Sequence, residues 1–308
     1  MTNCIVLGGN GLIGSHIVEQ LVDRGCNVKV FDRFTGKNKL QVVDCKIERV
    51  EGDYLKRQDV KRALKNIDVL FHSIHTTVPS TSIQHPLFDA KTNILPAIRL
   101  LQDSIYAGVK KFIYLSSIAV YGAPERIPIK ETDPPKPVSP YGLSKLAIEK
   151  YIEYFGRVKG LDYVILRASA TYGERQSISS ESGVVVNFIY NAKRKKQISI
   201  YGDGSTLRDL THAEDIARGA VKAALEKTRP RLFNLGTGGG VTLNQLAERV
   251  ETITGNEVRI KYKKNRGDVK NHVFDVSRAN KMLGSGWKAT ISIDDGIRRC
   301  YEELLKRD

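Results

Sequence analysis

The sequence predicts an α/β protein built on a doubly wound parallel sheet, followed by a smaller lobe. Short apolar runs alternate with amphipathic helical segments through the first half of the 308 residues, which is typical of βαβ units. A glycine-rich turn joins the first apolar run to the first helix, with the spacing of a phosphate-binding loop. After residue 168 the alternation loosens, so we expect the second half to build the smaller lobe.

The first thirty-two residues predict one complete βαβ unit. Residues 2–7 form a short apolar run typical of a buried strand, and residues 13–22 place aliphatic side chains on one helical face. Gly25 ends that helix, and residues 28–32 form the next strand.

Glycines at positions 8, 11 and 14 follow the first strand. Gly8 permits a tight turn, Gly11 lets a pyrophosphate approach the backbone, and Gly14 lets the helix pack close to the sheet. Leu12 and Ile13 open the helix, so their end of it faces the phosphates. An unoccupied glycine turn is the alternative, but the strand before and the helix after favour dinucleotide binding.

Acidic residues end the next two strands. Asp32 can accept hydrogen bonds from the adenosine ribose, which favours NAD over NADP, whereas Arg33 beside it can hold the 2′-phosphate of NADP. Asp53 falls where the adenine edge would lie; alternatively, it caps the helix that follows.

The remaining elements continue the alternation. Further strands are expected at residues 47–50, 68–72, 111–117 and 163–167. Helices are expected at 87–107, from Tyr141 onward, and near 184–194, 243–253, 277–283 and 293–306. Residues 123–140 form a Pro-rich loop that can close over a site. Residues 231–236 are expected to return as a strand to the main sheet.

Composition limits the function classes. The net charge of +15 includes basic runs at 193–196 and 261–266, which could bind nucleic acid. Without a recognition motif a solvated surface is favoured, and such a surface would steer an anionic substrate. The four cysteines lie far apart, and His72, His75 and His85 lack metal-ligand spacing, so we expect no disulfide framework and no metal.

Neither a signal peptide nor a membrane-spanning run is evident. The chain enters its first strand directly, and no apolar run reaches the length needed to cross a bilayer. We therefore expect a cytoplasmic protein without a membrane or nucleic-acid partner.

A Ser-Tyr-Lys trio carries the predicted chemistry. Tyr141 and Lys145 are four residues apart, so a helix places both on one face. An ammonium near the phenol is expected to lower the tyrosine pKa and let Tyr141 exchange a proton with a sugar hydroxyl. Ser117, at the end of a strand, can bind the same hydroxyl. Tyr-x-x-x-Lys alone also occurs on ordinary surface helices. The catalytic interpretation of the trio therefore depends on the glycine turn and the strand-end serine that accompany it.

With these motifs the chain resembles the extended short-chain dehydrogenase/reductase superfamily, and within it the nucleotide-sugar epimerases/dehydratases, above all the UDP-glucose 4-epimerases. Further similar segments are residues 115–122, 201–209, 233–238 and 267–269. The resemblance implies a Rossmann domain over 1–168, joined by 210–238, and a nucleotide-sugar lobe from 169–209 and 239–308.

The same resemblance implies ligands and an assembly. NAD is the implied cofactor, a UDP-sugar the substrate, and a homodimer the assembly. Arg208 would hold phosphate, Asp268 the uridine ribose, and Asn93 would lie near the nicotinamide end. Lys145 would also contact the nicotinamide ribose.

Two positions depart from the family pattern. Ala170 stands where relatives carry an asparagine that contacts the diphosphate, and Ser169 is a candidate replacement. Asn265-Arg266 stands near the place of a usual arginine, and Arg266 could substitute from one position over.

The residues after the strand-end serine favour one reaction of this family. Dehydratases carry an Asp-Glu pair there and decarboxylases a nearby glutamate, but this chain has Ile118 and Ala119. Epimerisation through a 4-keto sugar remains, with NAD regenerated in each cycle and tightly bound. The alternatives are an NAD(P)H-dependent sugar reductase and a non-catalytic NAD- or RNA-binding relative.

The sugar itself stays open among UDP-glucose, UDP-N-acetylglucosamine and UDP-uronic acids, since their epimerases share these motifs. By resemblance His272 lies near the position that sets pocket size, and its bulk favours UDP-glucose and UDP-galactose. Alternatively, His272 is a surface residue of a strand.

Overall fold

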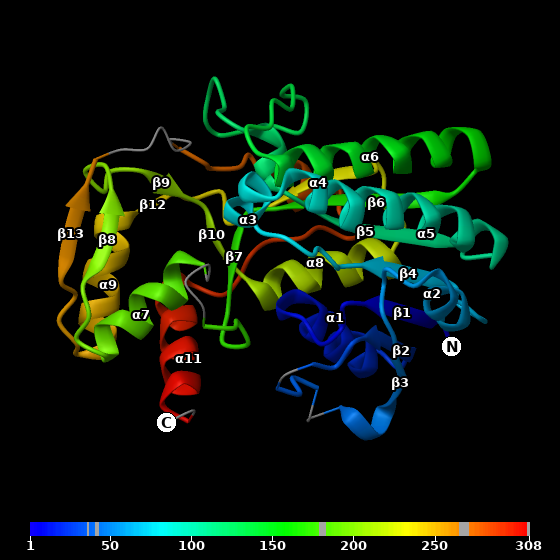
Figure 1. Cartoon of the computed structure of the whole chain (residues 1–308), viewed down its shortest axis with the longest axis horizontal. Coiled ribbons are helices and arrows are strands. Elements are labelled where there is room, and N and C mark those ends of the chain that lie inside the picture. The colour runs from blue at the N-terminus through cyan, green and yellow to red at the C-terminus, as the bar shows by residue number, and fades with distance from the viewer. Residues whose placement is uncertain (36, 41–42, 179–182, 265–270, 307–308) are drawn as a thin grey trace.

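A seven-stranded parallel sheet forms the centre of the chain (Figure 1). The computed structural model describes residues 1–35, 37–40, 43–178, 183–264 and 271–306. The strand order is β11-β6-β5-β4-β1-β2-β3. The strands are β1 (Asn3–Leu7), β2 (Asn27–Asp32), β3 (Ile47–Glu51), β4 (Val69–His72), β5 (Lys111–Ser117), β6 (Asp162–Ala168) and β11 (Leu232–Leu235). The predicted return of a late strand is confirmed, because β11 pairs with β6.

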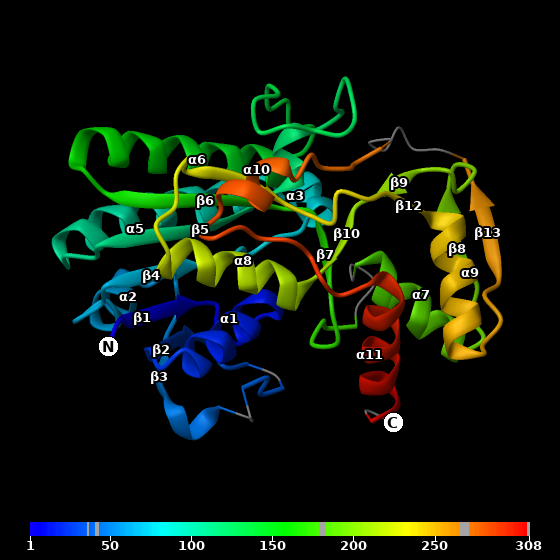
Figure 2. The same cartoon turned by 180° about the vertical axis from the view of Figure 1, so that it is seen from behind.

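Helices cover both faces of this sheet, as the doubly wound prediction requires (Figures 1 and 2). The strands alternate their side chains between two apolar cores. Cys4 and Val6 face the core formed with α1 (Leu12–Asp23) and α8 (Ala213–Leu225), whereas Ile5 and Leu7 face the opposite core. That second core is completed by α2 (Arg57–Ala63), α5 (Leu95–Tyr106) and α6 (Pro140–Lys159). We predicted no helix over the α8 residues.

The helix expected over residues 87–107 is interrupted. Helix α3 (Pro79–Gln84) is followed by α4 (Pro86–Asp89), by a π-helical turn over Ala90–Ile94, and then by α5. Pro96 has no N–H to donate to a carbonyl one turn earlier, so a regular hydrogen-bond ladder cannot run through this point.

The smaller lobe has an apolar core of its own. It consists of α7 (Val184–Lys193), α9 (Leu243–Thr254) and α11 (Ile293–Leu305) packed beside the parallel pair β8 (Ile198–Tyr201) and β13 (Ile260–Lys263). The lobe lies at the left of Figure 1. Further elements connect it to the main sheet: β7 (Ala170–Tyr172), β9 (Leu207–Arg208), β10 (Leu210–His212), β12 (Val241–Thr242) and α10 (Ser277–Met282). Within the described ranges, no helix combines the length and apolarity needed to cross a bilayer.

A buried ion pair fixes α6 to the sheet. Glu149 on α6 is completely buried and accepts hydrogen bonds from Arg167 of β6, at 3.0 Å from Nε and 2.6 Å from a terminal nitrogen. Ser116 of β5 donates to the same carboxylate at 2.5 Å, and the guanidinium stacks 4.6 Å from the centre of the Tyr121 ring. Removing either charged partner leaves the other desolvated and unpaired.

Arg167→Met should therefore lower the free energy of unfolding by about 3–5 kcal/mol, as measured by urea denaturation. Arg298→Met is the control, because Arg298 pairs with Asp295 where both side chains are more than half exposed, and its loss should cost under about 1 kcal/mol. The double variant Glu149→Met/Arg167→Met should be more stable than Arg167→Met alone. Equal losses for Arg167→Met and Arg298→Met would contradict the argument.

Candidate active site

A cavity of about 850 Å³ opens at the carboxyl edge of the sheet, between the sheet and the smaller lobe. This edge is where ligands bind in doubly wound folds. Its walls include Ser117 at the end of β5, Ser169 just after β6, and Arg208 and His272 from the side of the lobe. The cavity therefore collects residues from both halves of the chain.

The predicted trio of Ser117, Tyr141 and Lys145 lines one region of this cavity. Ser139 begins α6 by accepting a hydrogen bond from the Gly142 N–H at 3.2 Å, which places Tyr141 in the first turn. The Tyr141 backbone N–H donates to the Ser82 hydroxyl at 3.0 Å. One turn later, the Lys145 ammonium lies 5.9 Å from the centre of the Tyr141 ring.

The electrostatics of the trio differ from our prediction. Burial raises the pKa of Tyr141 above its ordinary value, and the Ser117 hydroxyl only partly offsets this effect. Lys145 donates to the Leu115 carbonyl at 2.8 Å instead of reaching the phenol. The expected lowering of the Tyr141 pKa is therefore wrong for these protein groups alone, because desolvation of the phenol dominates.

Lys145 is itself strongly perturbed. Burial lowers the pKa of its ammonium to about 7, against the opposing influence of the Glu149 and Asp89 carboxylates. A lysine with such a pKa changes its charge near neutral pH. Without the two carboxylates the charged form would be still less favourable.

The glycine turn fits a dinucleotide pyrophosphate. Gly8 has a φ of +81°, which favours glycine. A Cβ on Gly14 would collide with the Gly8 carbonyl oxygen, so only glycine lets α1 approach the turn this closely. Gly11 begins α1 without a side-chain cap, which leaves the first-turn N–H groups for an anion, and Ile13 lines the cavity one residue after Leu12.

Asp32 and Asp53 lie at strand ends, as predicted. The Asp32 carboxylate accepts from the Asn10 N–H at 3.0 Å and the Arg33 N–H at 2.8 Å, which ties the end of β2 to the glycine turn. A carboxylate has further lone pairs, so it can still accept from a ribose. Asp53 accepts from the Leu55 N–H at 2.9 Å; it does not cap α2, so our capping alternative is wrong.

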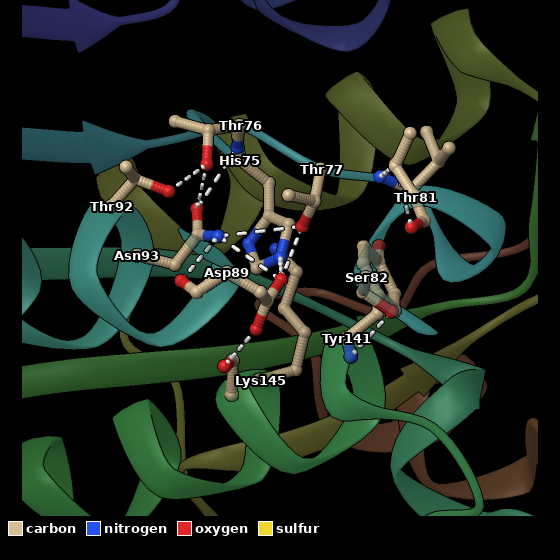
Figure 3. Close-up of polar contacts among 12 residues, drawn as sticks. His75, Thr76, Thr77, Thr81, Ser82, Asp89, Thr92, Asn93, Tyr141 and Lys145 are labelled. Carbon is tan, nitrogen blue, oxygen red and sulfur yellow. Dashed lines mark hydrogen bonds and ion pairs between the residues drawn. The ribbon is translucent and has the colours of Figure 1, made fainter. Parts of the chain in front are cut away.

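Asn93 is held away from the cavity. Its carbonyl oxygen accepts from the Thr76 N–H at 2.9 Å, and its amide nitrogen donates to the Asp89 backbone carbonyl at 3.0 Å (Figure 3). The side chain is 2% exposed and is not part of the cavity wall. Asn93 thus holds the loop after β4 through Thr76, and contact with the nicotinamide end stays a prediction.

The lobe side of the cavity carries the candidate substrate residues. The backbone of Arg208 in β9 forms an isolated parallel β-bridge with the backbone of His272. The Nε2 of His272 lies 2.7 Å from the Gly122 carbonyl oxygen, and His272 lines the cavity. The interpretation of His272 as a surface residue is therefore wrong. The buried Ser169 hydroxyl donates to the Thr211 hydroxyl at 2.7 Å. Asp268 lies outside the described residues, as do the neighbouring Asn265 and Arg266.

Asp209 is a residue of this region that sequence reasoning missed. Its buried carboxylate accepts from the backbone N–H groups of Thr237 at 2.8 Å, Gly238 at 3.2 Å and Phe274 at 3.3 Å. It thereby joins its own segment to residues 237–238 and to Phe274, three segments that are far apart in the sequence. No local pattern could have signalled this link.

The three neighbouring histidines have different environments. His72 is buried in β4 with Nε2 at 2.9 Å from the Tyr54 hydroxyl, and His85 is exposed. His75 lies in the loop after β4 and lines the cavity beside Tyr141. In the described part of the chain, no three His, Cys, Asp or Glu side chains are grouped to hold a metal ion.

The charge of Lys145 predicts a pH-dependent stability. Its pKa in the folded chain, about 7, lies below the ordinary value of 10.5, so between these values the unfolded chain binds more protons. The lysine's contribution to the free energy of unfolding therefore rises with pH across this window. Lys145→Met removes that dependence, so its stability relative to wild type should be highest near about pH 6 and fall toward about pH 10.

Urea unfolding of both proteins across this range is the measurement. The exposed Lys150→Met is the matched control on the same helix, and its difference from wild type should stay flat with pH. A flat difference for Lys145→Met would mean that Lys145 keeps an ordinary pKa.

Comparisons with known proteins agree with this geometry. A model of the NAD dependent epimerase/dehydratase family matches residues 4–236. A putative UDP-glucose 4-epimerase of Methanocaldococcus jannaschii is 34% identical over 298 residues, which cover 96% of each chain. A solved UDP-glucose 4-epimerase from Thermotoga maritima, with UDP-glucose, is 35% identical with a TM-score of 0.92 over 99% of each chain.

A second solved structure carries a different sugar specificity in its name. It is a UDP-N-acetylglucosamine 4-epimerase from Methanobrevibacter ruminantium in complex with UDP-N-acetylmuramic acid. It is 29% identical, with a TM-score of 0.92 over 100% of this chain and 99% of that one. With the family model covering most of its length, the chain belongs to the NAD dependent epimerase/dehydratase family.

Proposed function

We propose that this chain catalyses the NAD-dependent 4-epimerisation of a UDP-sugar. The observation that carries the proposal is the meeting of Ser117, Tyr141 and Lys145 on the wall of one cavity. The relatives named UDP-glucose 4-epimerase, which the chain matches over nearly its full length, support it. Ile118 and Ala119 line the same cavity, so no carboxylate stands at the positions where dehydratases carry their acid and base.

Tyr141 is the group that moves the proton. Bound NAD supplies a hydride acceptor that later returns the hydride to the sugar. Tyr141 takes the proton from the C4 hydroxyl as the 4-keto sugar forms, and it gives the proton back when the sugar is reduced from the other side. Ser117 holds the sugar oxygen, and the Lys145 ammonium stabilises the phenolate form of Tyr141 that accepts this proton.

The burial of these groups serves the same step. Burial raises the pKa of Tyr141 and lowers that of Lys145, so burial favours the neutral form of each group taken alone. A negative phenolate and a positive ammonium stabilise each other in a site of low dielectric constant. The pair therefore gains most from its mutual attraction before Tyr141 accepts the proton and again after Tyr141 has returned it.

The lobe side of the cavity is assigned to the nucleotide sugar. Arg208 is a cation at the wall opposite the sheet, suited to a diphosphate. His272 occupies space on the same side of the cavity, which favours UDP-glucose and UDP-galactose over the N-acetylated sugars. The likeness to a UDP-N-acetylglucosamine 4-epimerase makes that sugar the competing candidate.

The four cysteines are free thiols, which supports a cytoplasmic enzyme.

Incubation with separate UDP-sugars, without added cofactor, tests the reaction by following inversion at C4. Tyr141→Phe should reduce turnover by about 10²–10⁴-fold while the protein keeps its NAD, because the variant lacks only the proton-transferring hydroxyl. Ser117→Ala should have the smaller effect, since it removes a hydrogen bond and leaves the proton acceptor. Consumption of one reduced cofactor per sugar would instead show a reductase, and near-normal turnover of Tyr141→Phe would exclude the proposed role.

We further propose that the chain forms a homodimer across α5 and α6. Along α6 the side chains of Ala147, Tyr151, Tyr154 and Val158 repeat at the spacing of one helical face, and the last three are 40–50% exposed. On the neighbouring α5, Leu95 is 50% exposed. A second copy placing the same two helices against these would cover both apolar faces with one two-fold contact.

Leu95→Glu/Tyr154→Glu should therefore convert the dimer into a monomer, because four carboxylates would face the contact. The molar mass from light scattering coupled to gel filtration is the measurement. Leu305→Glu on α11, where Leu305 is 49% exposed, is the matched control and should stay dimeric. A wild type that elutes as a monomer, or a double variant that stays dimeric, would contradict this assembly.

A further inference from the structure

His75 occupies a position in the cavity that the mechanism above does not use. It lies in the loop after β4, and its ring packs edge-to-face against Tyr141 with ring centres 4.6 Å apart (Figure 3). Only 8% of its side chain is exposed, and it lines the same cavity as the trio. An imidazole this deeply buried normally has hydrogen-bond partners for its nitrogens.

Neither ring nitrogen of His75 has a hydrogen-bond partner among the described residues. The Asp89 carboxylate lies 3.6 Å from Nε2, which is longer than a hydrogen bond. Both nitrogens are shielded from solvent. The unmet hydrogen-bonding capacity therefore belongs to a buried side chain of the cavity wall.

Asp89 determines which nitrogen carries the proton. It is completely buried and accepts hydrogen bonds from Thr77, Ser144 and Asn93, so it is held as a carboxylate that can only accept. The His75, Ser144 and Thr77 side chains hold the pKa of Asp89 at about 2 against the effect of burial. The Nε2 of His75 faces this anion, which favours the tautomer protonated on Nε2.

His75 is neutral in this setting. Burial lowers the pKa of the imidazole to about 4; the Lys145 ammonium acts in the same direction and the Asp89 carboxylate opposes it. A neutral imidazole with its proton on Nε2 has a lone pair on Nδ1. That lone pair is an acceptor placed beside the tyrosine that exchanges the proton.

We propose that Nδ1 of His75 accepts a hydrogen bond from an O–H or N–H group of a ligand bound beside Tyr141, while Asp89 orients the imidazole for this contact. The donor belongs either to the nicotinamide half of NAD or to the sugar of the nucleotide sugar. His75 is thus a ligand-binding residue of the site, and Asp89 is its positioning residue. The inference rests on the proposed function for the identity of these two ligands.

Two substitutions of His75 distinguish the contribution of the Nδ1 acceptor from that of the aromatic ring. His75→Phe keeps an aromatic ring against Tyr141 and removes both nitrogens, whereas His75→Asn keeps a polar atom near the position of Nδ1. His85→Phe is the control, since His85 lies on the exposed end of α3 in the same region. Calorimetric titration of NAD into protein stripped of its bound cofactor, and of UDP-glucose into the NAD-loaded protein, gives a dissociation constant for each ligand without requiring turnover.

His75→Phe should raise one of the two dissociation constants by roughly 3- to 10-fold, the effect of one lost hydrogen bond. A rise for NAD alone assigns the donor to the cofactor, and a rise for UDP-glucose alone, with a matching rise in KM, assigns it to the sugar. His75→Asn should recover most of the affinity, and His85→Phe should equal wild type. Unchanged constants in folded His75→Phe, or no recovery in His75→Asn, would overturn the proposal.

The imidazole nitrogens of the wild type provide a second test that needs no variant. With ¹⁵N-labelled histidine, His75 should show the tautomer protonated on Nε2, and the Nδ1 resonance should shift on adding NAD or UDP-glucose. A proton on Nδ1, or a resonance insensitive to both ligands, would refute the assignment. Neither result depends on epimerisation, so a failure of the proposed reaction would be recognised separately.

Discussion

The site depends on burying charge between the sheet and α6 and on pairing that charge. Lys145, Glu149, Arg167 and Asp89 are each at most 4% exposed. Desolvation opposes every one of these charges, so each persists only through its partners. Glu149 is neutralised by Arg167, whereas Lys145 has no carboxylate as a direct partner in the described structure and is supported at a distance by Glu149 and Asp89. The pKa of Lys145 therefore stays near neutrality instead of falling further.

The same carboxylates also position the surrounding backbone. Asp89 is the last residue of α4 and accepts hydrogen bonds from Thr77 of the loop after β4 and from Ser144 of α6, so one side chain links that loop to α6. The π-helical turn that follows places Asn93 against the same loop. A regular helix through these residues would rotate Asn93 relative to Asp89, because the extra residue of a π turn shifts every later side chain around the axis. The irregular helix is thus a structural condition of the site.

Local patterns in the sequence were sufficient to predict the sheet and the Ser117, Tyr141 and Lys145 side chains that meet on one cavity wall. The glycine turn and the strand-end serine report backbone conformation within a few residues, and the Tyr141–Lys145 spacing reports one helical face, so each could be predicted. The contacts of Asp209, Asp89 and His75 join segments far apart in the chain and leave no periodic signal. The direction of the Tyr141 pKa was wrong for a related reason, since burial is a property of the whole fold. Helix α8 was missed although its alanine-rich sequence is locally helical.

The choice among reactions depends on apolar residues as much as on the trio. Every member of this family that removes a hydride from a sugar needs a proton acceptor and a bound cofactor, and these parts alone do not separate epimerisation from dehydration. Ile118 and Ala119 present only hydrocarbon to the cavity beside Ser117. A 4-keto sugar held there meets no second acid or base from these two positions, so reduction at C4 is the step left to it. His75, neutral and oriented by Asp89, adds an acceptor on the other side of Tyr141 without adding a charge that could expel a leaving group. The polarity of the cavity walls thus limits which reactions can follow oxidation of the sugar at C4.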